Sequence, residues 1–151
     1  MVSLLERLMR QISVAPFTPL GLPSLCWEWM GAVDRFGHGR VKLDGRNFHV
    51  RRAIFGARGV SLSPDQHVIA LCRNCRCVNG EYFVVGTANE VRAFGSFGHV
   101  GIGDLLVAQQ MIANGEATAD YIAFCWDISE ALLISAMAKC RWDDQAFKKA
   151  S

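Results

Sequence analysis

The chain has 151 residues, about half of them apolar and a fifth charged, which fits one packed domain or two small ones and excludes wholesale disorder. No apolar run reaches the roughly 18 residues of a membrane span. Charges at Glu6, Arg7 and Arg10 interrupt the N-terminal apolar stretch, so no signal peptide is expected. Six cysteines without a secretion signal indicate a reducing compartment, where clustered thiols bind metal more often than they form disulfides. We therefore expect a cytoplasmic protein with no membrane partner.

The net charge of +2 is divided unevenly along the chain. Residues 31–58 hold seven basic and two acidic residues, a net charge of +5. Residues 93–151 hold four basic and seven acidic residues, a net charge of −3. A basic middle segment fits a polyanion such as nucleic acid, and an acidic C-terminal third does not.

Short elements are expected in the first third of the chain. Apolar residues at helical spacing predict an amphipathic helix over residues 3–12, ended by the prolines that follow. Residues 26–30 predict a short strand with both tryptophans on one face. The Asp44-Gly45 pair, between residues 40–43 and 47–50, is a strong hairpin signal.

The middle of the chain continues this α+β pattern. Residues 51–56 predict one or two helical turns, and residues 67–71 predict an apolar strand that leads directly into a run of cysteines. Thr87 is followed three positions later by Glu90, a capping-box pattern that predicts a helix over residues 87–94.

Glycine marks the boundary of the C-terminal third. Residues 95–103 contain four glycines in nine positions, which is typical of a linker and predicts a subdomain boundary. Helices are then predicted over residues 104–113, 118–124 and 129–139. The last two, joined by a tight turn, have the length pattern of a helix-turn-helix. Asp127 lies in that turn and tolerates a left-handed backbone better than most residues.

The cysteine run suggests a metal site. Three cysteines lie within six residues of one another: Cys72, Cys75 and Cys77. A structural Zn²⁺ site takes four ligands, so these thiols need help from elsewhere in the chain. Cys26 is the natural fourth ligand, with His49 or His67 as substitutes if one thiol points away. The alternative is that two of the three are ordinary buried cysteines.

The order of motifs between residues 24 and 92 resembles the phage-type HNH homing endonuclease family. The chain reads CWEWMG, a glycine-rich hairpin with a GR pair, VRRAIFG, and then CRNCRCVNGEYFVVGT. Members of the family typically read CWxWxG, a GR hairpin, AHR, and HxCxNPxCVNPxHLxxGT. The resemblance implies a small ββα-metal domain that is stabilised by zinc and binds duplex DNA.

The catalytic positions depart from the family pattern. The family's general base, a His two residues before the first cysteine of the run, corresponds to Ala70. Its last His, a ligand of the catalytic metal, corresponds to Tyr82, and the His of AHR corresponds to Arg51. The middle Asn is kept as Asn79. Because alanine cannot accept a proton and tyrosine, with a pKa of about 10, is a poor metal ligand, the resemblance implies a scaffold kept for binding rather than for cutting.

The C-terminal helical pair resembles a module that often follows the HNH domain in such endonucleases. Residues 121–129 are similar to its IAxxFGVS core, and Trp142 matches a tryptophan often found at its end. The exposed face of the second helix would present Glu130 and Ile134, whereas DNA-reading helices carry basic or amide side chains near their start. A protein contact or dimerisation is therefore favoured over groove reading, with simple core packing as a third possibility.

These patterns divide the chain into five parts. They are an N-terminal helix and connector (1–20), an HNH-like zinc domain (24–94), a linker (95–103), a helix-turn-helix-like segment (104–142) and a tail (143–151). The expected fold class is α+β, a small zinc-stabilised ββα-metal domain followed by a short helical bundle.

The hypothesis for function is a catalytically inactive DNA-binding protein, phage-encoded, that acts as a transcription regulator or host-takeover factor in the host cytoplasm. Its DNA surface would comprise basic residues of the hairpin and the following helix: Arg40, Lys42, Arg46, Arg51 and Arg52. One alternative is an active nicking endonuclease with shifted ligands, such as His49. The other is an adaptor whose C-terminal helices contact RNA polymerase or another large enzyme.

Overall fold

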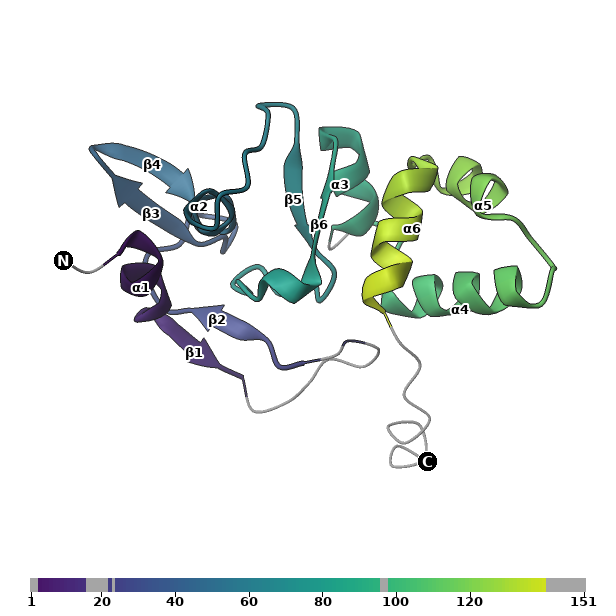
Figure 1. Cartoon of the computed structure of the whole chain (residues 1–151), viewed down its shortest axis with the longest axis horizontal. Helices are drawn as coiled ribbons and strands as arrows, with labels where there is room; N and C mark the ends of the chain where they lie inside the picture. The colour runs from purple at the N-terminus through teal and green to yellow at the C-terminus, as the bar shows by residue number, and fades with distance from the viewer. Residues whose placement is uncertain (1–2, 16–21, 23, 96–97, 141–151) are drawn as a thin grey trace.

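The computed structural model describes residues 3–15, 22, 24–95 and 98–140 (Figure 1). Within these ranges the chain forms three separate two-stranded antiparallel sheets and several helices, which confirms the α+β class. The chain advances from one end of the molecule to the other, with the first sheets at one end and the last helices at the opposite end. The predicted tail and Trp142 lie outside the described residues.

The N-terminal helix is shorter than the sequence predicts. α1 (Leu4–Met9) begins with a capping box in which Ser3 and Glu6 exchange hydrogen bonds, and β1 (Ile12–Val14) follows it. Ile12 pairs with Trp29 of β2 (Trp27–Trp29). The expectation of a helix through residue 12 is therefore wrong, because this segment forms its backbone hydrogen bonds with a strand that is distant in sequence.

The predicted hairpin consists of β3 (Arg40–Leu43) and β4 (Arg46–His49), and α2 (Val50–Ala57) follows β4 directly. Asp44 and Gly45 have φ angles of 49° and 79°, the positive values that a two-residue hairpin turn of this kind requires. Gly39, just before β3, approaches the Trp29 indole so closely that an added Cβ would come within 2.8 Å of the ring. The hairpin is thus seated against a buried tryptophan.

A second strand pair carries the cysteine run. β5 (His67–Ala70) pairs with β6 (Phe83–Gly86), so residues 71–82 form a long connection that includes the one-turn helix η1 (Gly80–Tyr82). The sequence does not predict β6, because its apolar residues show no alternation. α3 (Ala88–Phe94) follows, and its predicted capping box between Thr87 and Glu90 is confirmed.

The three C-terminal helices lie where the sequence predicts them. They are α4 (Ile102–Ala113), α5 (Ala119–Trp126) and α6 (Glu130–Lys139). Asp127 ends α5 in a left-handed conformation with a φ angle of 55°. In the described ranges no single helix is long and apolar enough to cross a membrane. α5 and α6 reach that length and composition only together, and they are bent by 104° at their turn.

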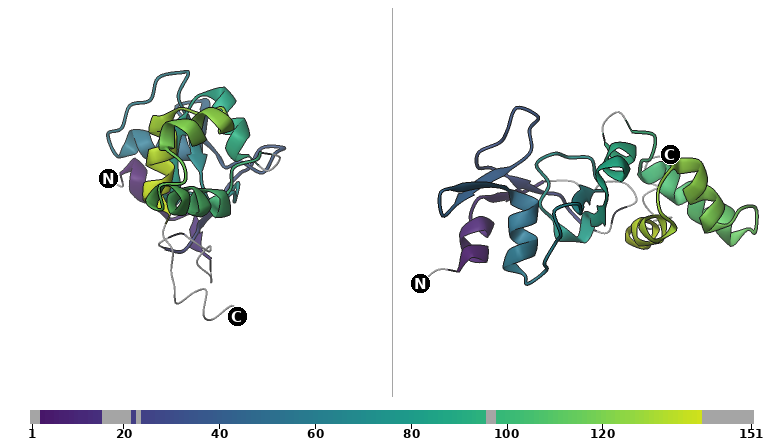
Figure 2. Two further views of the ribbon diagram at one scale, coloured as in Figure 1. Left: turned by 90° about the vertical axis from the view of Figure 1, so that its right-hand side faces the viewer. Right: turned by 90° about the horizontal axis from the view of Figure 1, so that it is seen from above.

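Two apolar cores hold the described elements together. Seen from above, α1 and the first strands lie at one end of the molecule and α4–α6 at the other (Figure 2). The smaller core joins α1, β2 and α2 around Trp29, which is 1% exposed. The larger core extends from β5 and β6 through α3 into α4–α6. Val100, inside the glycine-rich 95–103 segment, is fully buried in this core, and Arg73 donates a hydrogen bond to its carbonyl. The larger core therefore continues across the segment predicted to be a linker.

Candidate metal centre and histidine-lined cleft

Three of the four predicted metal ligands come together. The sulfur atoms of Cys26, Cys72 and Cys77 all lie within 4.8 Å of one another. Cys77 is held beside β2, because Trp29 donates its backbone N–H to the Arg76 carbonyl at 2.8 Å and Val78 donates to the Trp27 carbonyl at 2.7 Å. These backbone contacts bring the loop after β5 onto the strand that follows Cys26. We call this group the cysteine triad.

The triad favours a single negative charge. A hydrogen bond from the Cys72 thiol lowers the pKa of Cys77 to about 6. Burial and the charge on Cys77 raise the pKa of Cys26 to about 11. The hydrogen bond to Cys77, together with burial, also raises the pKa of Cys72. Three thiolates can therefore coexist here only when a cation compensates their charge, and the residues present fit a metal ion.

The fourth predicted ligand, Cys75, is not part of the triad. It lines a cleft that opens beside the loop, where its Cβ lies 3.8 Å from the position that a Cβ on Gly37 would occupy. Tyr82 is instead the residue buried beside the triad. Its side chain is fully buried, and its phenolic oxygen has no hydrogen-bond partner among the described residues. Burial raises the pKa of Tyr82, and the neighbouring Cys26 and Cys77 raise it further.

Asn79 fixes the approach to the triad. Its side-chain amide donates hydrogen bonds to the Ser24 hydroxyl at 3.0 Å and to the Leu25 carbonyl at 2.8 Å, and its oxygen accepts one from the Glu81 backbone at 3.1 Å. Asn79 is 2% exposed. Of the three positions that the family resemblance places in one catalytic centre, Asn79 and Tyr82 lie beside the triad and Ala70 lines the cleft.

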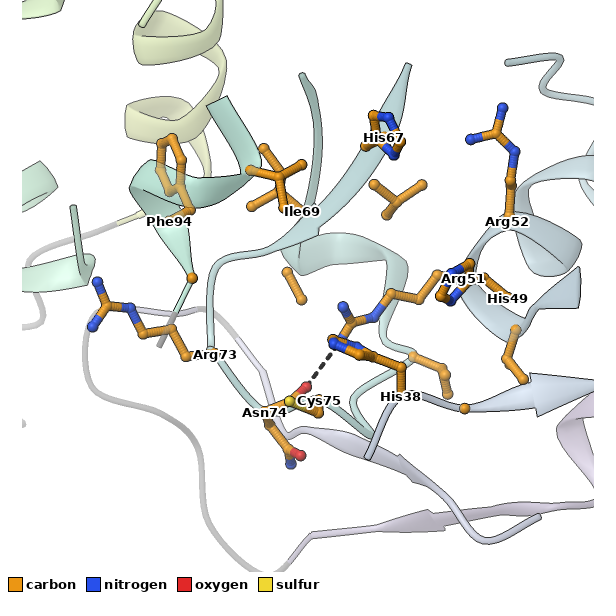
Figure 3. Close-up of a pocket in the computed structure, with 17 residues that line it drawn as sticks. His38, His49, Arg51, Arg52, His67, Ile69, Arg73, Asn74, Cys75 and Phe94 are labelled. Carbon is orange, nitrogen blue, oxygen red and sulfur yellow. Dashed lines mark hydrogen bonds between the residues drawn. The ribbon is translucent and has the colours of Figure 1, made fainter. Parts of the chain in front are cut away.

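The cleft has a volume of about 320 Å³ and lies between the β3–β4 hairpin with α2 on one side and β5 with α3 on the other (Figure 3). Its lining contains three imidazoles and three guanidinium groups: His38, His49, His67, Arg51, Arg52 and Arg73. Among the described residues that line it, none is an aspartate or a glutamate. The cleft is therefore suited to an anion. We call it the histidine cleft.

Two arginines predicted to bind DNA are used to hold loops. Arg51 donates hydrogen bonds to the Cys77 carbonyl at 2.8 Å and to the Asn74 carbonyl at 2.7 Å, so it braces the cysteine loop. Arg52 donates to the carbonyls of residues 63 and 66 at 2.6 and 2.5 Å, which closes the turn before β5. Their charges remain, but these donors are engaged with backbone carbonyls.

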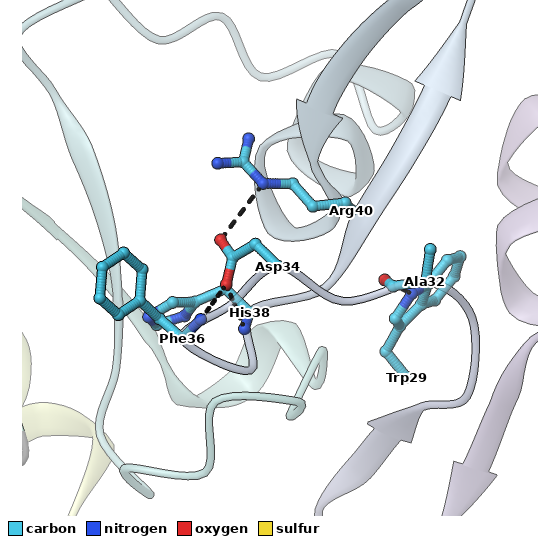
Figure 4. A network of polar contacts seen from close by, with 6 residues as sticks. All are labelled: Trp29, Ala32, Asp34, Phe36, His38 and Arg40. Atoms are coloured by element: carbon cyan, nitrogen blue, oxygen red, sulfur yellow. Dashed lines mark hydrogen bonds and ion pairs between the residues drawn. The ribbon is translucent and has the colours of Figure 1, made fainter.

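A small polar network folds the loop that carries His38 (Figure 4). The Asp34 carboxylate accepts backbone hydrogen bonds from Phe36 at 2.9 Å and His38 at 3.1 Å, and it pairs with the Arg40 Nε at 3.3 Å. Burial opposes ionisation, but the two backbone hydrogen bonds lower the pKa of Asp34. The loop is thereby folded so that the His38 ring lies edge-on to the His49 ring, with 6.1 Å between centroids.

His49 is held in a positive environment. Burial lowers its pKa, and the charges of Arg40 and His38 lower it further. The sequence assigns no role to His38, because the glycine-flanked loop that brings it to β4 has no regular periodicity. His99 lies elsewhere, with its Nε2 3.0 Å from the Trp126 carbonyl.

The chain is similar to Protein 2.8 of Escherichia phage T7, with 29% identity over 90 residues. The matched region covers 59% of this chain and 57% of that protein, so it spans little more than half of either. No protein-family model and no solved structure matches the chain. The similarity supports a phage origin.

Proposed function

We propose that this chain binds duplex DNA through the β3–β4 hairpin of a zinc-stabilised, HNH-like scaffold, and that it does not cleave the DNA. The observation that carries the proposal is the register of the hairpin. Arg40 faces His49 and Lys42 faces Asn47 across the two strands, so these four polar side chains share one face. We call it the basic face; none of its four residues is acidic, and Asp34 pairs with Arg40 at its edge.

The opposite face of the hairpin packs toward the protein. Val41 and Leu43 pack against the smaller core, so the basic face is the one available to a ligand. Arg46 pairs with Leu43 and belongs to this opposite face, which makes it a weaker candidate for DNA contact than Lys42. The major groove of DNA admits a two-stranded ribbon, in which lysine and arginine contact phosphates or guanine and asparagine contacts adenine.

Zinc is the metal that the triad suits best. Thiolates are the ligands of structural Zn²⁺ sites, and sulfurs bound to one tetrahedral ion lie about 3.8 Å apart, within the spread observed here. Cys26, Cys72 and Cys77 would hold the ion, and the Tyr82 phenol is a buried polar group beside them without a hydrogen-bond partner among the described residues. A bound ion would tie the start of β2 to the loop after β5 and would stabilise the platform under the hairpin.

Two observations support binding without cleavage. Ala70, at the position of the family's general base, offers no proton acceptor to the cleft. In the described part of the chain the triad is also the one group of three His, Cys, Asp or Glu whose ligand atoms lie close enough to share a metal. In a phage-infected host, such a protein would act as a transcription regulator or host-directed factor.

A second candidate function is an endonuclease with a relocated active site. The specific observation in its favour is that three histidines line the cleft that contains Ala70. One of them could accept a proton from water if a metal were bound nearby by the DNA phosphate itself.

One experiment separates these functions. Supercoiled plasmid is incubated with the purified protein and Mg²⁺ or Mn²⁺, and binding and nicking are measured in parallel. The proposal predicts that bound protein slows the migration of the plasmid in a gel and that the plasmid stays supercoiled. It also predicts that Lys42→Gln weakens retardation, whereas Arg92→Gln, an exposed change on α3, leaves it unchanged. Metal-dependent nicking that is lost in His38→Gln would establish the relocated nuclease instead.

A further inference from the structure

We propose that the histidine cleft binds a nucleotide, with its terminal phosphate among the imidazoles and its nucleoside against the apolar wall of the cleft. The nucleotide can be free or can be the 5′-phosphorylated end of a strand, because both present the same phosphomonoester. The inference goes beyond duplex binding by the basic face, which requires no strand end and no occupant of the cleft.

The polar end of the cleft supplies the phosphate donors. His38 and His49 lie side by side at this end, and His67 lies across the cleft on β5 (Figure 3). Among the described residues, none of these three imidazoles has a hydrogen bond to another protein group. Arg51, beside them, uses its Nε and Nη2 on the Cys77 and Asn74 carbonyls and contributes charge. The three imidazoles are therefore free to donate to a ligand.

The side of the cleft away from His38 and His49 presents an apolar surface beside Arg73 (Figure 3). Ile69 of β5 and Val91 and Phe94 of α3 form this apolar wall. A purely inorganic anion gains nothing from such a surface, whereas a nucleoside has a flat, weakly polar base that buries favourably against it. The volume of about 320 Å³ lies at the lower end of the range for small-molecule sites and suits a mononucleotide.

Charge selects a phosphomonoester. A phosphomonoester carries a charge of about −1.5 to −2 at neutral pH, more than the single charge of an internal phosphodiester. The charged groups around the imidazoles are mostly cationic: Arg40, Arg51 and Arg52, opposed by Asp34 near His38 and by Asp65 near His67. Because the lining has no carboxylate, a dianion meets no like charge inside the cleft, and a metal cation would lack its preferred oxygen ligands.

The test measures binding of five probes to the full-length protein by isothermal titration calorimetry: adenosine 5′-monophosphate, adenosine, inorganic phosphate, a DNA duplex with 5′-phosphates and the same duplex without them. We expect adenosine 5′-monophosphate to bind more tightly than either adenosine or phosphate. Preference for phosphorylated over unphosphorylated duplex assigns the site to strand ends. Binding of the mononucleotide with no such preference assigns it to free nucleotides.

Variants locate the binding. His38→Gln and His67→Gln should each weaken nucleotide binding about tenfold, the loss expected for one charge-assisted hydrogen bond. His99→Gln, outside the cleft, should leave it unchanged. In the wild type, saturating nucleotide should raise the pKa of His49 measured by NMR, since a neighbouring anion favours the imidazolium. This second readout does not depend on any variant folding.

The inference is overturned if no probe binds, if adenosine binds as tightly as its monophosphate, or if His99→Gln weakens binding as much as His38→Gln. A failure of this inference can be told apart from a failure of duplex binding. Lys42→Gln should weaken duplex binding and leave nucleotide affinity unchanged. Closed circular DNA has no strand ends and therefore measures duplex binding alone.

Discussion

The Glu90 carboxylate accepts a hydrogen bond from the backbone N–H of Ser129 at 2.8 Å, which joins the start of α3 to the start of α6. The same carboxylate accepts the Thr87 N–H at 3.0 Å as part of the capping box of α3. One buried side chain therefore caps two helices, one on each side of the glycine-rich segment. Glu90 and the larger core together make the C-terminal helices continuous with the rest of the protein.

Glu90→Gln should lower the free energy of unfolding by about 1–2 kcal/mol, because an amide has one acceptor oxygen for the two N–H groups. Chemical denaturation at pH 7 measures this loss. Glu130→Gln, an exposed change in the first turn of α6, is the matched control and should cost less than about 0.5 kcal/mol. Equal effects of the two variants would show that the bridge contributes nothing specific.

The bridge should also make stability pH-dependent. Burial opposes ionisation of Glu90, but the hydrogen bonds from Ser129 and Thr87 lower its pKa below the ordinary value of 4.5. A group whose pKa is lower in the folded state stabilises the fold above its unfolded pKa. The contribution of Glu90 should therefore be complete above pH 4.5 and be lost as the pH falls through the folded-state value. Wild type and Glu90→Gln should converge in stability at acid pH.

Removal of metal should destabilise the protein. At a free Zn²⁺ concentration 1,000-fold above its dissociation constant, binding contributes about 4 kcal/mol, and a chelator should remove this contribution. Cys77→Ser should abolish the response to chelator, whereas Cys125→Ser, which changes an exposed cysteine, should retain it. Thermal unfolding with and without chelator is the measurement. A wild-type melting temperature that is indifferent to chelator, in protein free of metal by elemental analysis, would contradict the zinc site.

Tyr82→Phe tests whether the phenol completes the metal site. If the buried oxygen contacts the ion, its removal should weaken Co²⁺ binding about tenfold, and Tyr82→His, which supplies a preferred ligand, should restore it. The absorption spectrum of bound Co²⁺ reports both affinity and coordination. If the phenol is not a ligand of the ion, Tyr82→Phe should leave Co²⁺ binding unchanged. The substitution should then stabilise the fold, because it removes a buried oxygen without a hydrogen-bond partner.

Local signals were sufficient for much of the fold. The Asp44-Gly45 turn and the capping box at Thr87 are encoded by neighbouring residues, and both are present as predicted. β1 and β6 escaped prediction because a two-stranded pair is stabilised by its partner strand, which local spacing does not identify. The glycine-rich segment was misleading for a related reason, because the burial of Val100 depends on the larger core and not on its glycine neighbours.

The candidate site was only partly predictable. The spacing of the cysteines anticipated that Cys72 and Cys77 would meet Cys26, but a two-residue separation left open which thiol would point away, and it is Cys75. The sequence identifies Arg51 as a cation but does not predict its hydrogen bonds, because the two carbonyls that accept them become its neighbours only after folding. The histidine cleft draws on the 34–38 loop, β4 and β5, a combination that no single motif contains.

The salt dependence of duplex binding tests the central claim most directly. The affinity of the protein for a DNA duplex that carries its label at an internal position is measured across a salt series for wild type, Lys42→Gln and Arg92→Gln. The account predicts a linear fall of log affinity with log salt, with a slope that Lys42→Gln reduces by about 0.9, the value for one phosphate contact, and that Arg92→Gln leaves unchanged. No binding at low salt, or a slope that Lys42→Gln does not alter, would contradict DNA recognition by the basic face.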